Sequence, residues 1–423
     1  MERSFPAGSG ECMQYLAHEF NDTTLRFVLQ YPGVVDAEIL ADATVALTAS
    51  VDILHASFVA HRVHAEWIEH PNFARADCFA VVRTDNDPME TAKEIAVQPI
   101  RAEDPAKIFC TLVQGPDSAA LVLRISHLCA DGVDGKYLLD KLVEAYNLRL
   151  QTGSCHGLQV KNGNRAPEQM YDYLSDEEKK ALMKNPLSGV KNGFPFPDIR
   201  QGRPDACVQI IPADIMSAAR ARARGEKATA NDLLMAACYH AYAALPEVDA
   251  KAPMSVLGMM DMRRHCKDIS ALGLCNMAGS LPTVLQEGVS DTFSETLARI
   301  AVQTNAVKED PCAGLKGLPL LHMAARRLPM WLLQKAARRV YGGMGFGMTN
   351  IGNLNLEQYC LGPLRPVGGW FGGPLKKKPS MQVSVASFDG ACALSIVGEF
   401  TQQDAAALTA FLQAMAKEIE NYA

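Results

Sequence analysis

Residues 118–150 change within one turn from the pattern of a buried strand to that of an amphipathic helix. The stretch SAALVLRIS (118–126) is rich in Val, Leu and Ile, which predicts a strand. From Asp134 onward the apolar residues fall on one stripe with helical spacing: Leu138, Leu139, Leu142, Val143 and Tyr146. Asp131 or Asp134 is suited to cap this helix. A strand that passes so directly into a helix favours a fold in which helices cover β-sheets.

Further strand and helix patterns alternate along the chain. In the first half, strands are predicted at 78–84 and 107–114, the latter joined to 118–126 by a short turn, and apolar spacing predicts a helix over 36–59. In the second half, the patterns predict strands at 207–212, 255–263 and 379–390, and helices at 213–224, after Thr229, at 292–309, around 318–340 with an interruption at Pro329, and at 402–423. Asp389-Gly390 predicts a tight hairpin turn.

The segment 151–206 differs from its surroundings, because it is rich in Gly, Pro and Asn around one polar helix pattern, SDEEKKALM. Such composition is typical of an interdomain linker. A chain of 423 residues is also long for one hydrophobic core. We therefore predict an α/β protein with an N-terminal lobe over 1–175, a linker over 176–206 and a C-terminal lobe over 207–423.

Charge and cysteine usage exclude several classes of function. The formal net charge of −6 leaves no basic footprint for nucleic acid. The 12 cysteines form no CxxC pair, and the N-terminal residues lack the organisation of a secretory signal, so we expect a reducing, cytoplasmic location. No apolar run is long enough to predict a membrane span. Walker A and HExxH patterns are absent from the sequence.

His127, Asp131 and Gly132 form a His-x3-Asp-Gly pattern where the predicted strand meets the predicted helix. On a turn the imidazole can be partly exposed, and its pKa near neutrality suits a general base. The alternative is a hydrogen-bonded turn histidine without a chemical role. The pattern alone does not decide between the two.

At this point the sequence resembles a known superfamily. SHLCADG is similar to the HxxxDG signature of acyl-CoA-dependent acyltransferases, which include condensation domains of peptide synthetases and the alcohol and chloramphenicol acetyltransferases. Three further segments resemble that superfamily in the same order: VQIIPADIMSAARARARGEKATANDLLMAACYHAYA and MMDMRRH, then TNIGNL, then SVASFDGACALSI. Condensation domains carry two adjacent histidines, whereas Ser126 takes the first position here. The single histidine is closer to the stand-alone acyltransferases.

The resemblance implies two chloramphenicol-acetyltransferase-like lobes with mixed sheets flanked by helices, arranged in a V around a central tunnel. It implies acyl transfer from a thioester to a hydroxyl or amine, with His127 as general base and no covalent acyl-enzyme. Asp131 would then pair with Arg263 as a structural brace, and Gly132 would allow a close approach of the backbone to substrate or a positive φ. The co-substrate would be acyl-CoA or a phosphopantetheinyl thioester, with no tightly bound cofactor or metal. A small-molecule acceptor and an acyl carrier protein are the candidate partners.

Two groups of side chains are candidates for binding. Oxyanion or substrate contacts are expected from the hairpin strand or the segment before it, at Gln382, Ser384, Ser387 or Asn350. Lys376, Lys377 and Lys378 are candidates for a CoA phosphate or an acidic carrier protein, and a solvated loop is the alternative.

Other interpretations remain open. The chain can be an inactive relative that binds a thioester or a partner protein in the same cleft. Cys129 can be read as a hydrolase nucleophile, although a small buried core residue is favoured. Surface histidines are favoured over a zinc site at His55, His61, His64 and His70. Packing on the core is favoured over membrane binding for the basic segment around Pro329. The glycines of 341–353 indicate a flexible segment rather than a dinucleotide site.

Overall fold

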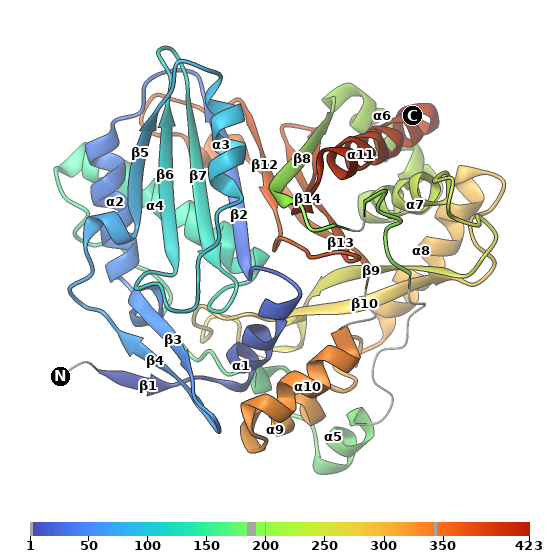
Figure 1. Cartoon of the computed structure of the whole chain (residues 1–423), viewed down its shortest axis with the longest axis horizontal. Coiled ribbons are helices and arrows are strands. Elements are labelled where there is room, and N and C mark those ends of the chain that lie inside the picture. Colours follow the sequence, from blue (N-terminus) through green and yellow to red (C-terminus); the bar gives the residue numbers. More distant parts are fainter. Residues whose placement is uncertain (1–2, 184–191, 199, 342–344) are drawn as a thin grey trace.

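The computed structural model describes residues 3–183, 192–198, 200–341 and 345–423, with the backbone alone for 339–341. Two large β-sheets, each flanked by helices, make up most of the described chain (Figure 1). Both sheets contain parallel as well as antiparallel strand pairs. The predicted α/β class with mixed sheets is therefore confirmed.

The first sheet has five strands: β2 (Thr24–Tyr31), β5 (Phe79–Arg83), β6 (Ile108–Gln114), β7 (Ala119–Ser126) and β12 (Gly368–Gly372). Their spatial order is β12-β2-β7-β6-β5. Every residue of β7 is buried, as its continuous apolar run predicts. Helices α2 (Ala37–Ala49) and α4 (Gly132–Thr152) pack together on one face, and α3 (Pro88–Ala96) lies against the other (Figure 1).

Helix α4 begins where its sequence supplies a cap. The side chain of Asp131, rather than that of Asp134, accepts hydrogen bonds from the backbone N–H groups of Val133 and Asp134. One turn on, a β-carbon at Gly135 would lie 2.8 Å from Cε2 of Phe27, so the glycine lets α4 approach β2 closely. The cap and this contact fix the turn that carries His127.

The second sheet has six strands, in the order β10-β9-β11-β13-β14-β8. They are β8 (Arg203–Ile211), β9 (Met254–Asp261), β10 (Ala278–Leu285), β11 (Phe346–Leu354), β13 (Met381–Phe388) and β14 (Ala391–Phe400). Its helices are α6 (Ala213–Gly225), α7 (Ala230–Ala243), α8 (Phe293–Glu309) and α11 (Gln402–Tyr422). Asp389 and Gly390 both have positive φ, which produces the predicted two-residue turn between β13 and β14.

Strand β12 links the two halves of the chain. It belongs to the second half by sequence, yet it pairs antiparallel with β2, with Trp370 opposite Val28. The predicted boundary at residues 206 and 207 therefore does not separate the two sheets. In the predicted linker, 176–206, the structure contains α5 (Asp176–Leu182) and the first residues of β8, while 184–191 and 199 lie outside the described residues.

Smaller elements complete the described chain. A third sheet consists of β1 (Ser4–Pro6), β3 (Ala56–Ala60) and β4 (Ala65–Glu69), and α1 (Ser9–Leu16) packs near α9 (Leu318–Arg327) and α10 (Met330–Tyr341). Single 3-10 turns are η1 (Ala17–Glu19), η2 (Asp52–His55), η3 (Arg75–Asp77), η4 (Pro167–Met170), η5 (Met262–His265) and η6 (Leu356–Tyr359). No described helix combines the length and apolar character that crossing a bilayer requires.

Three sequence predictions of secondary structure need correction or completion. The helix expected over 36–59 ends at Ala49, and residues 56–60 (ASFVA) instead pair as β3 with β4. The segment HRVH (61–64), whose two histidines have the i,i+3 spacing of a helix, is the turn between those strands. Much of the glycine-rich segment 341–353 is not a flexible loop but β11, paired in parallel with β13; residues 342–344 of it lie outside the described residues. The expected interruption at Pro329 is present between α9 and α10.

Candidate active site

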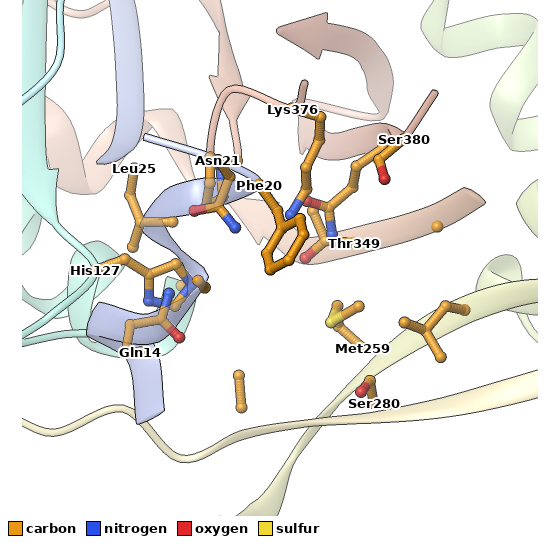
Figure 2. A pocket seen from close by; sticks show the side chains of 18 of the residues that line it. Gln14, Phe20, Asn21, Leu25, His127, Met259, Ser280, Thr349, Lys376 and Ser380 are labelled. Atoms are coloured by element: carbon orange, nitrogen blue, oxygen red, sulfur yellow. The ribbon is translucent and has the colours of Figure 1, made fainter. Parts of the chain in front are cut away.

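A cavity of about 250 Å³ lies between the two large sheets. The first half supplies Phe20, Asn21 and His127 to its wall, and the second half supplies residues of β9, β10, β11 and β13 (Figure 2). Both halves of the chain therefore contribute to the wall of the same cavity.

His127 reaches the cavity from the turn after β7. Its backbone N–H donates to the carbonyl oxygen of Thr23 at 2.7 Å, which ties the turn to the start of β2. Burial lowers the pKa of His127 below its ordinary value of 6.5; the nearby carboxylate of Asp131 opposes this effect, and the ammonium of Lys376 adds to it. The imidazole is therefore neutral at neutral pH, the form that accepts a proton.

Asn276 contacts this imidazole from the second half of the chain. Its Nδ2 lies 2.9 Å from Nδ1 and 3.3 Å from the carbonyl oxygen of His127, while its Oδ1 accepts from the backbone N–H of Ala278. The hydrogen bond from Ala278 identifies which end of the Asn276 side-chain amide is the oxygen. Asn276 therefore helps to set the orientation of the imidazole ring.

The carboxylate of Asp131 has four hydrogen-bond donors around it. Oδ1 caps α4, and Oδ2 accepts from Nη1 of Arg263 at 2.7 Å and from the backbone N–H of Met277 at 2.8 Å. Arg263 also lies 3.1 Å from Asp134. Burial alone would lower the pKa of Arg263, but the carboxylates of Asp131 and Asp134 outweigh it and raise the pKa. The ion pair expected from the sequence is present, and it joins the start of α4 to the segment after β9.

Gly132 is the first residue of α4, so its backbone is helical. The positive φ considered for it is therefore wrong. Gly132 does line the cavity, and a β-carbon there would lie 3.1 Å from Cγ2 of Ile351. Of the two roles considered for Gly132, a close approach of its backbone is the one that agrees with this geometry.

Of the four candidates for oxyanion or substrate contacts, Gln382 alone lines the cavity. Ser384, on the same face of β13, accepts from the backbone N–H of Gly373. Ser387 projects from the opposite face, because side chains alternate along a strand, and it accepts from Arg220. Asn350 accepts from the backbone N–H of Gly352. The last three side chains make these hydrogen bonds within the fold, and none of the three lines the cavity.

The three consecutive lysines have different surroundings. Lys376 lines the cavity. Lys378 instead pairs with the buried carboxylate of Asp404, and its Nζ also donates to the carbonyl oxygens of Asp198 and Arg200. The ammonium of Lys378 is therefore engaged in contacts within the fold and does not line the cavity. The remaining lysine, at 377, lies outside the cavity wall.

Cys129 and the histidine cluster lie away from this wall. The thiol of Cys129 is buried and donates to the carbonyl oxygen of Ser126, and burial raises its pKa to about 12. It is a core residue rather than an activated nucleophile. Two groups of three side chains have potential ligand atoms within 4.8 Å of one another: His61 with His64 and Glu66, and Asp52 with His55 and Glu69. Three of the four histidines considered as zinc ligands, His55, His61 and His64, therefore have a carboxylate close by.

No family model matches the chain, and no curated protein matches its sequence. Solved structures do match. Polyketide synthase associated protein 5 from Mycobacterium tuberculosis is 14% identical with a TM-score of 0.68, over 99% of this chain and 100% of that one. Trichothecene 15-O-acetyltransferase from Fusarium sporotrichioides is 13% identical with a TM-score of 0.71, over 99% and 95%. The first condensation domain of the CDA synthetase is 14% identical with a TM-score of 0.68, over 99% and 97%. The predicted fold, shared by acetyltransferases and condensation domains, is confirmed.

Proposed function

We propose that the chain is a stand-alone acyltransferase that moves an acyl group from a thioester to a hydroxyl or amine, with His127 as general base. The observation that carries this proposal is the position of the His127 imidazole in a cavity that both halves of the chain line. Burial also lowers the pKa of this imidazole, which favours its neutral form. Its turn is held at both ends, by Thr23, the residue before β2, and by the cap of α4 at Asp131. A base held in a fixed place is what general-base catalysis requires.

The reaction needs no covalent intermediate with the protein. His127 removes the proton of the attacking hydroxyl or amine as that group bonds to the thioester carbonyl carbon. The tetrahedral intermediate then collapses, the carbon–sulfur bond breaks, and the imidazolium returns the proton to the departing thiolate. Gln382 is the proposed hydrogen-bond donor to the transient oxyanion, because its amide lines the same cavity.

The donor is proposed to be acyl-CoA or a phosphopantetheinyl thioester on an acyl carrier protein, bound as a co-substrate. We retain the prediction that the two lobes enclose a tunnel in which donor and acceptor meet at His127. A tightly bound cofactor has no part in this chemistry, since the base and the oxyanion donor come from the chain itself.

The test is thiol release from a panel of short to long acyl-CoAs with mixed alcohol and amine acceptors. Acceptor-dependent release should fall about 10²-fold or more in His127→Ala. Cys129→Ala is the matched control and should retain activity, because that thiol does not reach the cavity. If no CoA thioester reacts, the same comparison is made with acylated carrier proteins. Release that His127→Ala leaves unchanged would refute the mechanism. An absence of release with every donor would favour a protein that binds without catalysis.

A further inference from the structure

Among the described residues of the cavity wall, one side chain is a cation. That charge belongs to Lys376; the other described side chains in the wall are apolar, amide or hydroxyl groups, together with the neutral imidazole of His127. Figure 2 shows Lys376 extending into the cavity from the loop before β13, while His127 approaches from another wall. A ligand next to His127 therefore meets a positive field without a compensating carboxylate in the wall.

The ammonium of Lys376 makes no hydrogen bond or ion pair with any described residue. The carboxylate that acts on it electrostatically is that of Asp22. Asp22, however, already pairs with Arg26 and accepts from the backbone N–H of Leu375 at 2.8 Å. Burial lowers the pKa of Lys376 to about 8, and Asp22 only partly opposes this effect. By contrast, Lys378 two residues later is fully satisfied. Lys376 is partly exposed at the cavity wall. A partly buried cation without a counter-ion is costly, and such groups are typical of binding sites.

A second polar group in the same wall also lacks a partner. The residue Gln382 is only 7% exposed, and its Oε1 has no hydrogen-bond partner among the described residues. Buried amide oxygens are normally satisfied, so this atom is available to a donor on a ligand. The cavity thus offers one unpaired cation and one unpaired hydrogen-bonding group to the same molecule.

We propose that the substrate bound beside His127 carries a carboxylate, which pairs with Nζ of Lys376 while Gln382 bonds a polar group of the same molecule. This inference rests on the proposed function only in naming the ligand a substrate. The carboxylate can belong to the acyl acceptor or to a dicarboxylic acyl group of the donor. The phosphates of CoA are a poorer match, because a long neutral arm separates them from the thioester.

The first experiment measures binding, so that it does not depend on turnover. Titration calorimetry compares straight-chain carboxylates from acetate to octanoate with the primary amides of equal length. At least one carboxylate should bind the wild type about 10-fold more tightly than its amide, as expected for a charged hydrogen bond. Lys376→Met, which keeps an aliphatic stem, should abolish the preference, and Lys377→Met should retain it. No preference in the wild type, or a preference that survives Lys376→Met, would overturn the inference.

The second experiment identifies which substrate carries the carboxylate. One arm compares hydroxy and amino acids with their amides as acceptors of acetyl-CoA, and the other compares succinyl-CoA with butyryl-CoA for neutral acceptors. At a pH above the acid limb of both proteins, Lys376→Met should lower kcat/KM about 10-fold more in the arm that contains the carboxylate than in the neutral pairs. An equal loss in every pair would mean that Lys376 acts on the common intermediate or the fold, and would overturn the inference. Lys376-dependent carboxylate binding without turnover would uphold it and refute the acyltransferase proposal.

Discussion

Replacing Asp131 by alanine removes a carboxylate that joins the two halves of the chain. Asp131 is 1% exposed and holds the cap of α4, Arg263 and the backbone N–H of Met277. Arg263 keeps its contacts to Asp134 and Asp261. The cost of losing its closest partner therefore lies at the lower end of the range for breaking a buried ion pair, about 3 kcal/mol. Loss of the cap adds about 1 kcal/mol. Asp131→Ala should therefore lower the free energy of unfolding by about 4 kcal/mol.

Asp36→Ala is the matched control for this substitution. Asp36 caps α2 with the same two bonds, to the backbone N–H groups of Glu38 and Ile39, but it is exposed. It should cost about 1 kcal/mol. The measurement is urea unfolding followed by tryptophan fluorescence, since Trp67 and Trp370 are both buried. If Asp131→Ala costs no more than Asp36→Ala, then the contact with Arg263 contributes nothing and the argument for a brace between the halves fails.

Three further outcomes are expected. The acid limb of kcat/KM should reflect a pKa of His127 below 6.5, so activity should persist as the pH falls through 6.5. Lys376→Met removes a positive neighbour of His127 and should move this limb to higher pH. A pH–rate profile that does not move in the variant would contradict this. Cys129 should resist iodoacetamide in the folded protein and react only in urea, as mass spectrometry of the labelled chain can establish, and labelling of the native thiol would contradict its burial. Lys378→Met should lower the free energy of unfolding by about 3 kcal/mol, because it leaves the carboxylate of Asp404, at the start of α11, buried without its cation. Lys377→Met should change the free energy of unfolding by less than about 0.5 kcal/mol. Equal urea midpoints for the two variants would argue against the ion pair.

Elements governed by local chemistry were predictable from the sequence. The passage from β7 into α4 follows from an apolar run, a capping carboxylate and a 3.6-residue stripe within one short segment. The turn at Asp389-Gly390 follows from two residues that tolerate positive φ. In each case the groups that decide the structure are neighbours in the chain, so their pattern is visible without knowledge of the fold.

Elements that depend on distant partners were not predictable. The segment 368–372, GGWFG, is short and glycine-rich, and it becomes a strand because β2 offers it an edge. Likewise, β11 is a strand because β9 and β13 lie on either side of it. Over 51–60 the apolar spacing fits a helix and a strand equally well, and pairing with β4 decides between them.

The residues of the candidate site also fall into two groups, those that the sequence could identify and those that it could not. His127, Asp131 and Arg263 could be found because their motif resembles that of a known superfamily. Asn276 could not, since it lies in the segment between η5 and β10, 149 residues from the histidine it contacts. The three lysines at 376–378 look equivalent in the sequence, and only the path of the backbone sends the first into the cavity and the third to α11.

The pairing of β12 with β2 also determines when the first sheet can be finished during synthesis. The other four strands have been made once residue 126 has emerged, but the fifth follows only at 368–372. Until then β2, which is buried along almost its whole length in the finished protein, presents an open edge of backbone N–H and C=O groups. A nascent chain exposes that edge to other chains for most of its translation. Completion of the first half therefore waits for nearly the entire polypeptide, and two separately expressed halves would have to rejoin by strand addition.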